Sequence, residues 1–187
     1  MLDVASGHAA ASAAVSDGLE ILTADQDHAT GLRTLIAGAL AHEGQSWSAK
    51  PPLHAEAEIS LEEIEALIAA QRSQLLVAVE GSTIVGCVLV TRLPGGHSAL
   101  GLLGVDPAWR RRGLGARLIA AAEMTAEREF GSDQIELCVL AERDRLAAYY
   151  ARLGFSPTGE HRTVPLADAT MEFLVMAKPL VQAAAYA

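Results

Sequence analysis

The chain has 187 residues, of which 14 are Lys or Arg and 23 are Asp or Glu, so the formal net charge is −9. Hydrophobic residues make up 51% and charged residues 20%, which is typical of a folded globular protein and excludes a disordered chain. The length suits one domain of about 100–200 residues. The acidic balance argues against nucleic-acid binding, because neutralising phosphates requires clustered Lys and Arg.

The sequence predicts neither a disulfide framework, nor a metal site, nor a membrane span. Cys87 and Cys138 lie in predicted strands without C-x-x-C spacing or nearby His, so we interpret them as core residues in a reducing compartment. No apolar run approaches the roughly 20 residues of a membrane-spanning helix. Residues 1–18 are rich in Ala and Ser and lack basic residues, which predicts a disordered leader and a cytoplasmic protein rather than a secreted one.

The first half of the chain predicts a strand, two helices, a hairpin and a further strand. Ser60 and Glu63 form a capping box at the start of the second helix. The residues between the two helices, 42–58, contain Gly and Pro without periodicity, which favours a long binding loop. In chain order we expect a strand at 19–23, helices at 25–41 and about 61–68, a hairpin at 75–79 and 83–93, and a strand at 99–105.

The second half predicts a helix that begins near residues 110–115, followed by a strand, a second helix, two strands and a short tail. The expected elements are a helix to 130, a strand at 134–140, a helix at 144–153, and strands at 155–160 and 171–176. There is no internal repeat. The order β-α-α-β-β-β-α-β-α-β-β predicts a single mixed α/β domain over residues 19–180, followed by a tail at 181–187.

Residues 105–116, Val-Asp-Pro-Ala-Trp-Arg-Arg-Arg-Gly-Leu-Gly-Ala, carry the strongest functional pattern. An apolar strand enters a glycine-containing turn where a helix begins, so the first N–H groups of that helix are free and the helix dipole is positive there. Three consecutive arginines flank the opening. The pattern predicts an anion site of the kind that binds phosphate or diphosphate.

Two common phosphate-binding folds do not fit this pattern. The chain lacks the Gly-Lys-Ser/Thr ending of a P-loop. Leu118 stands where a dinucleotide-binding fingerprint has its third glycine, and the motif follows a hairpin instead of opening a parallel βαβ unit.

The motif resembles motif A of the GNAT (Gcn5-related N-acetyltransferase) family, Gln/Arg-x-x-Gly-x-Gly/Ala, which is Arg110-x-x-Gly113-x-Gly115 here. A second block, ending Tyr150-Ala-Arg-Leu-Gly154-Phe155, is similar to the family's Tyr-x-x-x-Gly-Phe signature. Together with the strand order, the resemblance covers residues 19–178. It implies a GNAT-like α/β fold, with a mixed, mostly antiparallel sheet flanked by helices.

The resemblance also implies an acetyl-CoA site and the residues that form it. The strand end at Leu103, Gly104 and Val105 would offer backbone groups to the pantetheine arm. The loop would bind the diphosphate, and its residues are Arg110, Arg111, Arg112, Gly113, Leu114, Gly115 and Ala116. Many members have Asn seven residues before the signature Tyr, whereas this chain has Arg143. We include Arg143 among the candidate cofactor-binding residues, and the two alternatives for its side chain are the CoA phosphates and solvent.

Tyr150 occupies the position of the family's Tyr that protonates the departing thiolate, since a phenol with an ordinary pKa of about 10 holds its proton at neutral pH. The general base is open. Several relatives use a Glu on the strand before the loop, but residues 98–102 offer no carboxylate, which leaves His97, Glu136 and Glu142. Strand alternation predicts Glu136 and Cys138 on one face, and Glu136 is our catalytic candidate.

We therefore expect an acetyl-CoA-dependent N-acetyltransferase that acts on a primary amine, without a metal, nucleic-acid or membrane partner. The acidic net charge favours a cationic small-molecule acceptor. A non-catalytic acyl-CoA sensor, and a transferase for protein N-termini or longer acyl groups, remain the alternatives. A homodimer is a further open expectation.

Overall fold

The computed structural model describes residues 18–42, 59–165 and 170–180. Within them, seven strands form one sheet in the order β1-β2-β3-β4-β5-β7-β6. Every neighbouring pair is antiparallel except β4 and β5, which are parallel. The strands are β1 (Leu19–Thr23), β2 (Ser73–Glu80), β3 (Thr83–Arg92), β4 (His97–Val105), β5 (Gln134–Leu140), β6 (Ser156–Pro165) and β7 (Thr170–Pro179).

Two helical segments in the first half of the chain begin at side-chain caps. Asp25 accepts a hydrogen bond from the N–H of Asp27 at 3.0 Å and starts a 3-10 turn before α1. The capping box of Ser60 and Glu63 is confirmed, with both reciprocal hydrogen bonds formed at the start of α2. The helical elements are η1 (Gln26–His28), α1 (Ala29–His42), α2 (Leu61–Ala69), η2 (Pro107–Trp109), α3 (Leu114–Arg128) and α4 (Asp144–Arg152).

The expected mixed, mostly antiparallel sheet flanked by helices is confirmed, with differences at several element boundaries. The helix expected from residues 110–115 begins at Leu114 after the short turn η2, and the last two strands continue to Pro165 and Pro179. The predicted leader and tail, and most of the predicted 42–58 connection with Trp47, lie outside the described residues. Among the described helices, none is long and apolar enough to cross a membrane.

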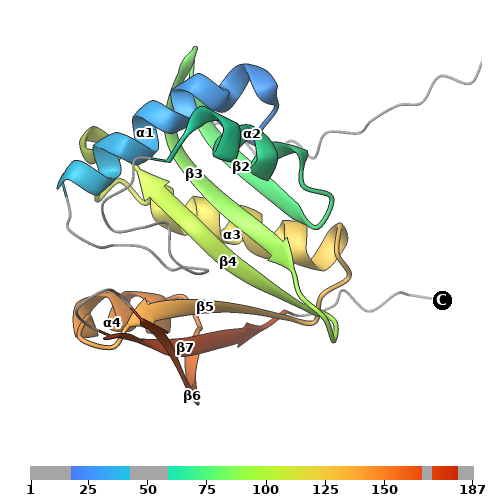
Figure 1. The fold of residues 1–187 in the computed structure, drawn as a ribbon, viewed down its shortest axis with the longest axis vertical. Helices are drawn as coiled ribbons and strands as arrows, with labels where there is room; N and C mark the ends of the chain where they lie inside the picture. The colour runs from blue at the N-terminus through green and yellow to red at the C-terminus, as the bar shows by residue number, and fades with distance from the viewer. Residues whose placement is uncertain (1–17, 43–58, 166–169, 181–187) are drawn as a thin grey trace, which may run out of the picture.

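The helices cover the two faces of the sheet in pairs. In Figure 1, α1 and α2 lie over β2, β3 and β4 on the near side, and α3 passes behind these strands. Leu32, Ile36 and Ile64 of the first pair pack on Val77 and Cys87. The opposite face is covered by residues of α3 and by the α4 region, which share one core cluster that includes Leu114, Leu118, Ile119, Ala122, Tyr150 and Phe155.

A glycine in β3 determines how closely α3 approaches the sheet. A Cβ at Gly86 would lie 2.9 Å from Cδ1 of Leu118 and 3.2 Å from the carbonyl oxygen of Gly104. A contact of 2.9 Å between a Cβ and another carbon is too short, so a larger residue at position 86 would displace Leu118 and push α3 away from the sheet. Because α3 begins directly at the predicted anion loop, Gly86 helps to place that loop against the end of β4.

Burial of Cys87 makes stability depend on pH in the alkaline range. Burial raises the pKa of the Cys87 thiol from 9.0 to about 12, so the folded state retains a proton that the unfolded state loses. This contribution to the free energy of unfolding is complete below pH 9 and is lost as the pH rises towards 12. We expect a decline of about 1 kcal/mol per pH unit, measured by urea denaturation at several pH values. In Cys87→Ala the decline should be shallower, and equal slopes would contradict this assignment.

Candidate functional site

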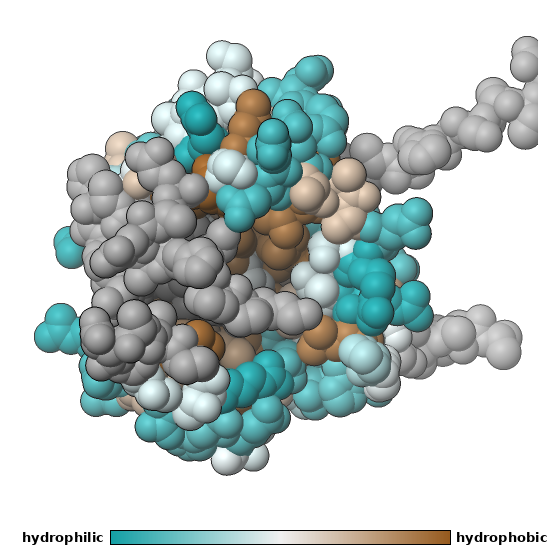
Figure 2. Space-filling model, viewed as in Figure 1, coloured by the Kyte–Doolittle hydropathy of each residue, from teal (hydrophilic) through white to brown (hydrophobic). Residues whose placement is uncertain are grey.

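The two central strands of the sheet separate soon after they meet. β4 and β5 pair only at His97 with Gln134, Ser98 with Ile135 and Ala99 with Glu136, whereas β5 and β7 pair along the whole length of β5. The joined end is fastened by a buried hydrogen bond of 2.8 Å between the hydroxyls of Ser98 and Ser132. Beyond it the strands diverge, and we call this opening the fork. Figure 2, drawn in the same view as Figure 1, shows apolar residues between the part of the molecule that contains β4 and the part that contains β5.

A β-bulge turns β4 as it enters the fork. The register with β3 shifts between Cys87 and Leu89, and Leu102 has a φ of 48°, a left-handed conformation that is uncommon for a bulky residue. The thiol of Cys87 donates to the carbonyl oxygen of Leu102 at 3.4 Å. The predicted residues Leu103, Gly104 and Val105 follow the bulge. They therefore lie on the stretch of β4 that has no β5 partner.

The loop after β4 forms the predicted anion site. Asp106 caps η2 by accepting a hydrogen bond from the N–H of Ala108 at 2.8 Å. Arg111 and Gly113 have positive φ angles of 61° and 79°, and α3 then begins without a side-chain cap and without an acidic residue in its first turn. The N–H groups of this turn, at Leu114, Gly115 and Ala116, receive no side-chain acceptor, so they and the helix dipole favour an anion.

The three arginines of this loop have different surroundings. Arg110 is partly buried and its Nε donates to the carbonyl oxygen of Val105 at 3.4 Å, which directs it back to the end of β4. Arg111 and Arg112 are exposed. The guanidinium of Arg112 lies 5.1 Å from the ring centre of Trp109, and Trp109 packs at the edge of the core. The loop thus carries two exposed cations beside the start of α3.

The two adjacent tyrosines of α4 lie in different environments. Tyr150, the predicted acid, is only 2% exposed and meets Phe155 edge to face at 5.9 Å between ring centres. Tyr149 is half-buried, and its hydroxyl lies 3.1 Å from the position that a Cβ on Gly115 would take. Tyr149 precedes the signature tyrosine and belongs to neither sequence motif. The structure places its hydroxyl at the start of α3.

Glu136 and Cys138 share one face of β5, as strand alternation predicts. Both meet Arg162 of β6, whose Nη1 lies 2.9 Å from Oε1 of Glu136 and 3.6 Å from Sγ of Cys138. Arg162 also donates to Glu160 at 2.8 Å, and these two carboxylates raise its pKa. Glu136 is buried, and its Oε1 receives no hydrogen bond of good geometry. No sequence motif indicated a role for Arg162.

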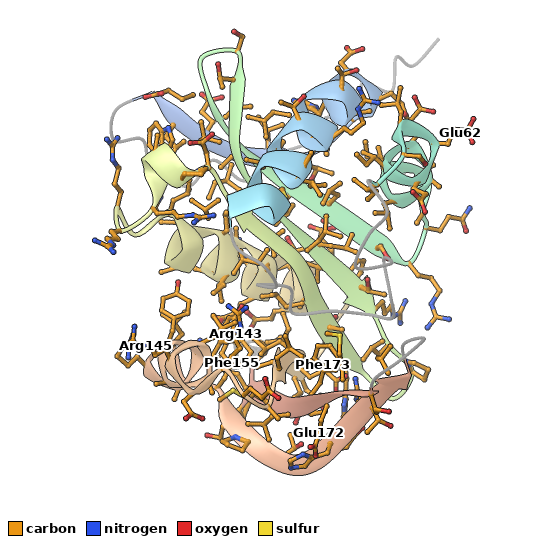
Figure 3. The ribbon with its side chains drawn as sticks, turned by 60° about the vertical axis from the view of Figure 1, so that its left-hand side comes forward. Glu62, Arg143, Arg145, Phe155, Glu172 and Phe173 are labelled. Atoms are coloured by element: carbon orange, nitrogen blue, oxygen red, sulfur yellow. The ribbon has the colours of Figure 1, made fainter. Side chains whose placement is uncertain are left out.

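The other base candidates lie at the joined end of β4 and after the end of β5. His97 is at the joined end of β4, with Nε2 3.9 Å from Oδ1 of Asp133. Glu142 is exposed between β5 and α4. Arg143 is the N-cap residue of α4 and makes no side-chain cap. Figure 3 shows the Arg143 side chain towards the middle of the molecule and Arg145 at its outer edge. Glu136 itself forms the last β4–β5 pair, with Ala99, and so lies where the fork begins.

A pocket of about 420 Å³ lies on the other side of β4, next to α1. Its lining includes Asp27, His28, Ile84 and Asp106, so it is one strand removed from the fork, and of the loop after β4 it touches only Asp106 and Pro107. In the described ranges, no three His, Cys, Asp or Glu side chains lie close enough together to hold a metal ion.

The model of the family described as "Acetyltransferase (GNAT) family" matches residues 41–155. The chain belongs to the GNAT family. The matched range includes the fork, the anion loop and α4, but it ends before Arg162. A search of curated proteins gave no match.

Solved GNAT structures have the same fold. The ribosomal-protein-S18-alanine N-acetyltransferase from Escherichia coli is 18% identical with a TM-score of 0.68, covering 90% of this chain and 98% of that one. An N-acetyltransferase from Thermoplasma acidophilum in complex with coenzyme A is 17% identical with a TM-score of 0.67, covering 86% and 98%. A spermidine N-acetyltransferase chimera from Vibrio cholerae is 14% identical with a TM-score of 0.66, covering 87% and 96%. At these identities the similarity shows the fold.

Proposed function

We propose that this GNAT protein transfers an acetyl group from acetyl-CoA to a primary amine. The observation that carries the proposal is the fork between β4 and β5, which opens beside an uncapped helix start and two exposed arginines. An extended arm with amide groups fits beside a strand that has lost its neighbour, and a diphosphate fits the positive end of α3. Acetyl-CoA contains both parts in this order.

Each predicted residue then has a defined task. The N–H groups of Leu114, Gly115 and Ala116 bind the diphosphate, with Arg111 and Arg112 adding positive charge. The backbone of Leu103, Gly104 and Val105 pairs with the pantetheine arm. Arg110 fixes the end of β4 through its bond to Val105. Arg143, which starts α4, adds a further cation for the CoA phosphates.

In the proposed reaction, the amine nitrogen attacks the thioester carbonyl carbon. The new C–N bond forms as the C–S bond breaks. Backbone N–H groups beside the bulge stabilise the negative charge that develops on the carbonyl oxygen. The surplus proton of the amine leaves to Glu136, directly or through water, and the hydroxyl of Tyr150 protonates the thiolate.

The charges around Glu136 favour a cationic small-molecule acceptor. Glu136 and Glu160 contribute −2 and Arg162 contributes +1, so the cluster that these three residues form has a net charge of −1. An ammonium group is attracted to such a site, as it is to the net charge of −9 on the whole chain. We expect the cytoplasm as the location and leave a homodimer open for measurement by sedimentation.

Calorimetry and a thiol-release assay test the proposed function. We expect acetyl-CoA to bind, and a panel of amines to include one that stimulates release of CoA detected by a thiol reagent. The background should be low, because Cys87 and Cys138 are both buried and burial raises the pKa of each. No heat of binding at near-millimolar acetyl-CoA would refute the cofactor assignment.

A second function, a non-catalytic acyl-CoA sensor, is favoured by the state of the two candidate catalytic side chains. Tyr150 is buried against Phe155, and Oε1 of Glu136 is held 2.9 Å from Nη1 of Arg162, so the ion pair occupies an oxygen that a base would need. A sensor would bind acetyl-CoA without release of CoA by any amine in the panel. Release of CoA from longer acyl-CoA substrates would indicate a transferase for longer acyl groups. Release of CoA stimulated by peptides would indicate a transferase for protein N-termini.

A further inference from the structure

The hydroxyl of Tyr149 occupies an unusual position for a helix side chain that packs on the core. It reaches from α4 to the first turn of α3, and its oxygen lies 3.1 Å from the Cβ position of Gly115. Cγ2 of Val105 lies 4.0 Å from the same position. Tyr149 therefore crosses from the β5 side of the fork to the helix start on the β4 side.

This hydroxyl has no hydrogen-bond partner among the described residues, although the side chain is half-buried. A phenol oxygen in partial burial usually has a partner. Burial also raises the pKa of Tyr149, with Arg152 acting in the opposite direction, so the O–H remains a donor at neutral and mildly alkaline pH. The group is therefore a hydrogen-bond donor beside the uncapped N–H groups of α3, with no acceptor in the part of the chain that the structure describes.

The surroundings of Tyr149 on α4 are positively charged. Arg145 and Arg152 stand four residues before it and three residues after it, on the same side of the helix. The guanidinium of Arg152 lies 5.9 Å from the ring centre of Tyr149. We therefore expect the hydrogen-bond acceptor of the Tyr149 hydroxyl to be an anion with oxygen atoms. This anion would lie between the start of α3 and the side of α4 that carries Arg145 and Arg152.

We propose that Tyr149 is a cofactor-binding residue whose hydroxyl donates a hydrogen bond to the diphosphate of CoA. The assignment rests on the proposed acetyl-CoA site and adds a side chain from α4 to a subsite otherwise built from the first N–H groups of α3 and the arginines of the loop. It also separates the adjacent tyrosines: Tyr149 acts on the diphosphate, and Tyr150 is left for the thiolate.

Tyr149→Phe tests the assignment, because it removes the hydroxyl and keeps the ring that packs at the edge of the core. A hydrogen bond to a charged group contributes enough that we expect the Kd for acetyl-CoA to rise about tenfold. In ³¹P NMR spectra of saturated complexes with CoA, the diphosphate signals should differ between wild type and variant, and the 3′-phosphate signal should not. Thermal melting of the free proteins checks that both are equally folded.

Three outcomes would overturn the assignment while leaving the acetyl-CoA site intact. The first is an unchanged Kd, and the second is a shift confined to the 3′-phosphate signal. The third is a lower kcat at saturating acetyl-CoA with an unchanged Kd, which would make Tyr149 the acid. Absence of acetyl-CoA binding by the wild-type protein would instead refute the proposed function itself.

Discussion

Tyr150→Phe is expected to lower kcat about 100-fold on an identified amine, since a positioned general acid typically contributes a factor of about 10²–10⁴. The substitution removes only the hydroxyl, so the ring contact with Phe155 at 5.9 Å is retained. The Kd for acetyl-CoA should change less than twofold, because the proton is required after the carbonyl is attacked. Steady-state kinetics and calorimetry measure the two quantities.

The pH profile gives this experiment a second readout. An acid that must hold its proton produces a fall of kcat at high pH, and this fall should be absent from Tyr150→Phe. An unchanged kcat, with chemistry shown to be rate-limiting by single-turnover measurements, would show that Tyr150 is a core residue and no acid. Its exposure of 2% makes that outcome a real alternative.

Leu118→Ala is expected to have the largest effect on stability. Leu118 is 0% exposed and packs on Gly86 of β3 at the point where a Cβ would already lie 2.9 Å from its Cδ1. Removing a fully buried Leu side chain leaves a cavity and costs about 3 kcal/mol of the free energy of unfolding. Urea denaturation measures the loss.

Met124→Ala is the matched control in the same helix, because Met124 is 36% exposed. We expect this change to cost less than about 1 kcal/mol. If the two variants lost equal stability, the packing of α3 on β3 would not be what holds the helix in place. Because α3 begins at the anion loop, Leu118→Ala should also weaken acetyl-CoA binding.

The local rules of the sequence were sufficient for the elements and for the anion loop. The capping box at Ser60 and Glu63 located α2, and alternation placed Glu136 and Cys138 on one face, where both meet Arg162. The loop residues 110–116 carried a motif whose physical meaning, a free helix start, does not depend on distant parts of the chain.

Contacts between distant segments could not be predicted in this way. Arg162 follows Glu136 by 26 residues, and their pairing depends on β7 lying between β5 and β6 in the sheet. The reach of Tyr149 to Gly115 depends on how α4 lies beside α3. The bulge at Leu102 is equally hidden, since a leucine in a run of strand-forming residues carries no signal for a positive φ. Each of these features arises from tertiary packing, which overrides local preference.

If acetyl-CoA binds as proposed, the short β4–β5 junction makes the folding stability of the protein depend on the acetyl-CoA concentration. Three residue pairs and one serine–serine hydrogen bond join β4 and β5 at one end. A ligand bound in the fork would contact both strands at the other end and would hold the two halves of the sheet together there. A ligand present at 100 times its Kd adds about 2.7 kcal/mol to folding stability. The backbone amides of β4 and β5 beyond Ala99 and Glu136 should then exchange their hydrogens more slowly when ligand is bound. The lifetime of the protein in the cell would increase with the concentration of acetyl-CoA.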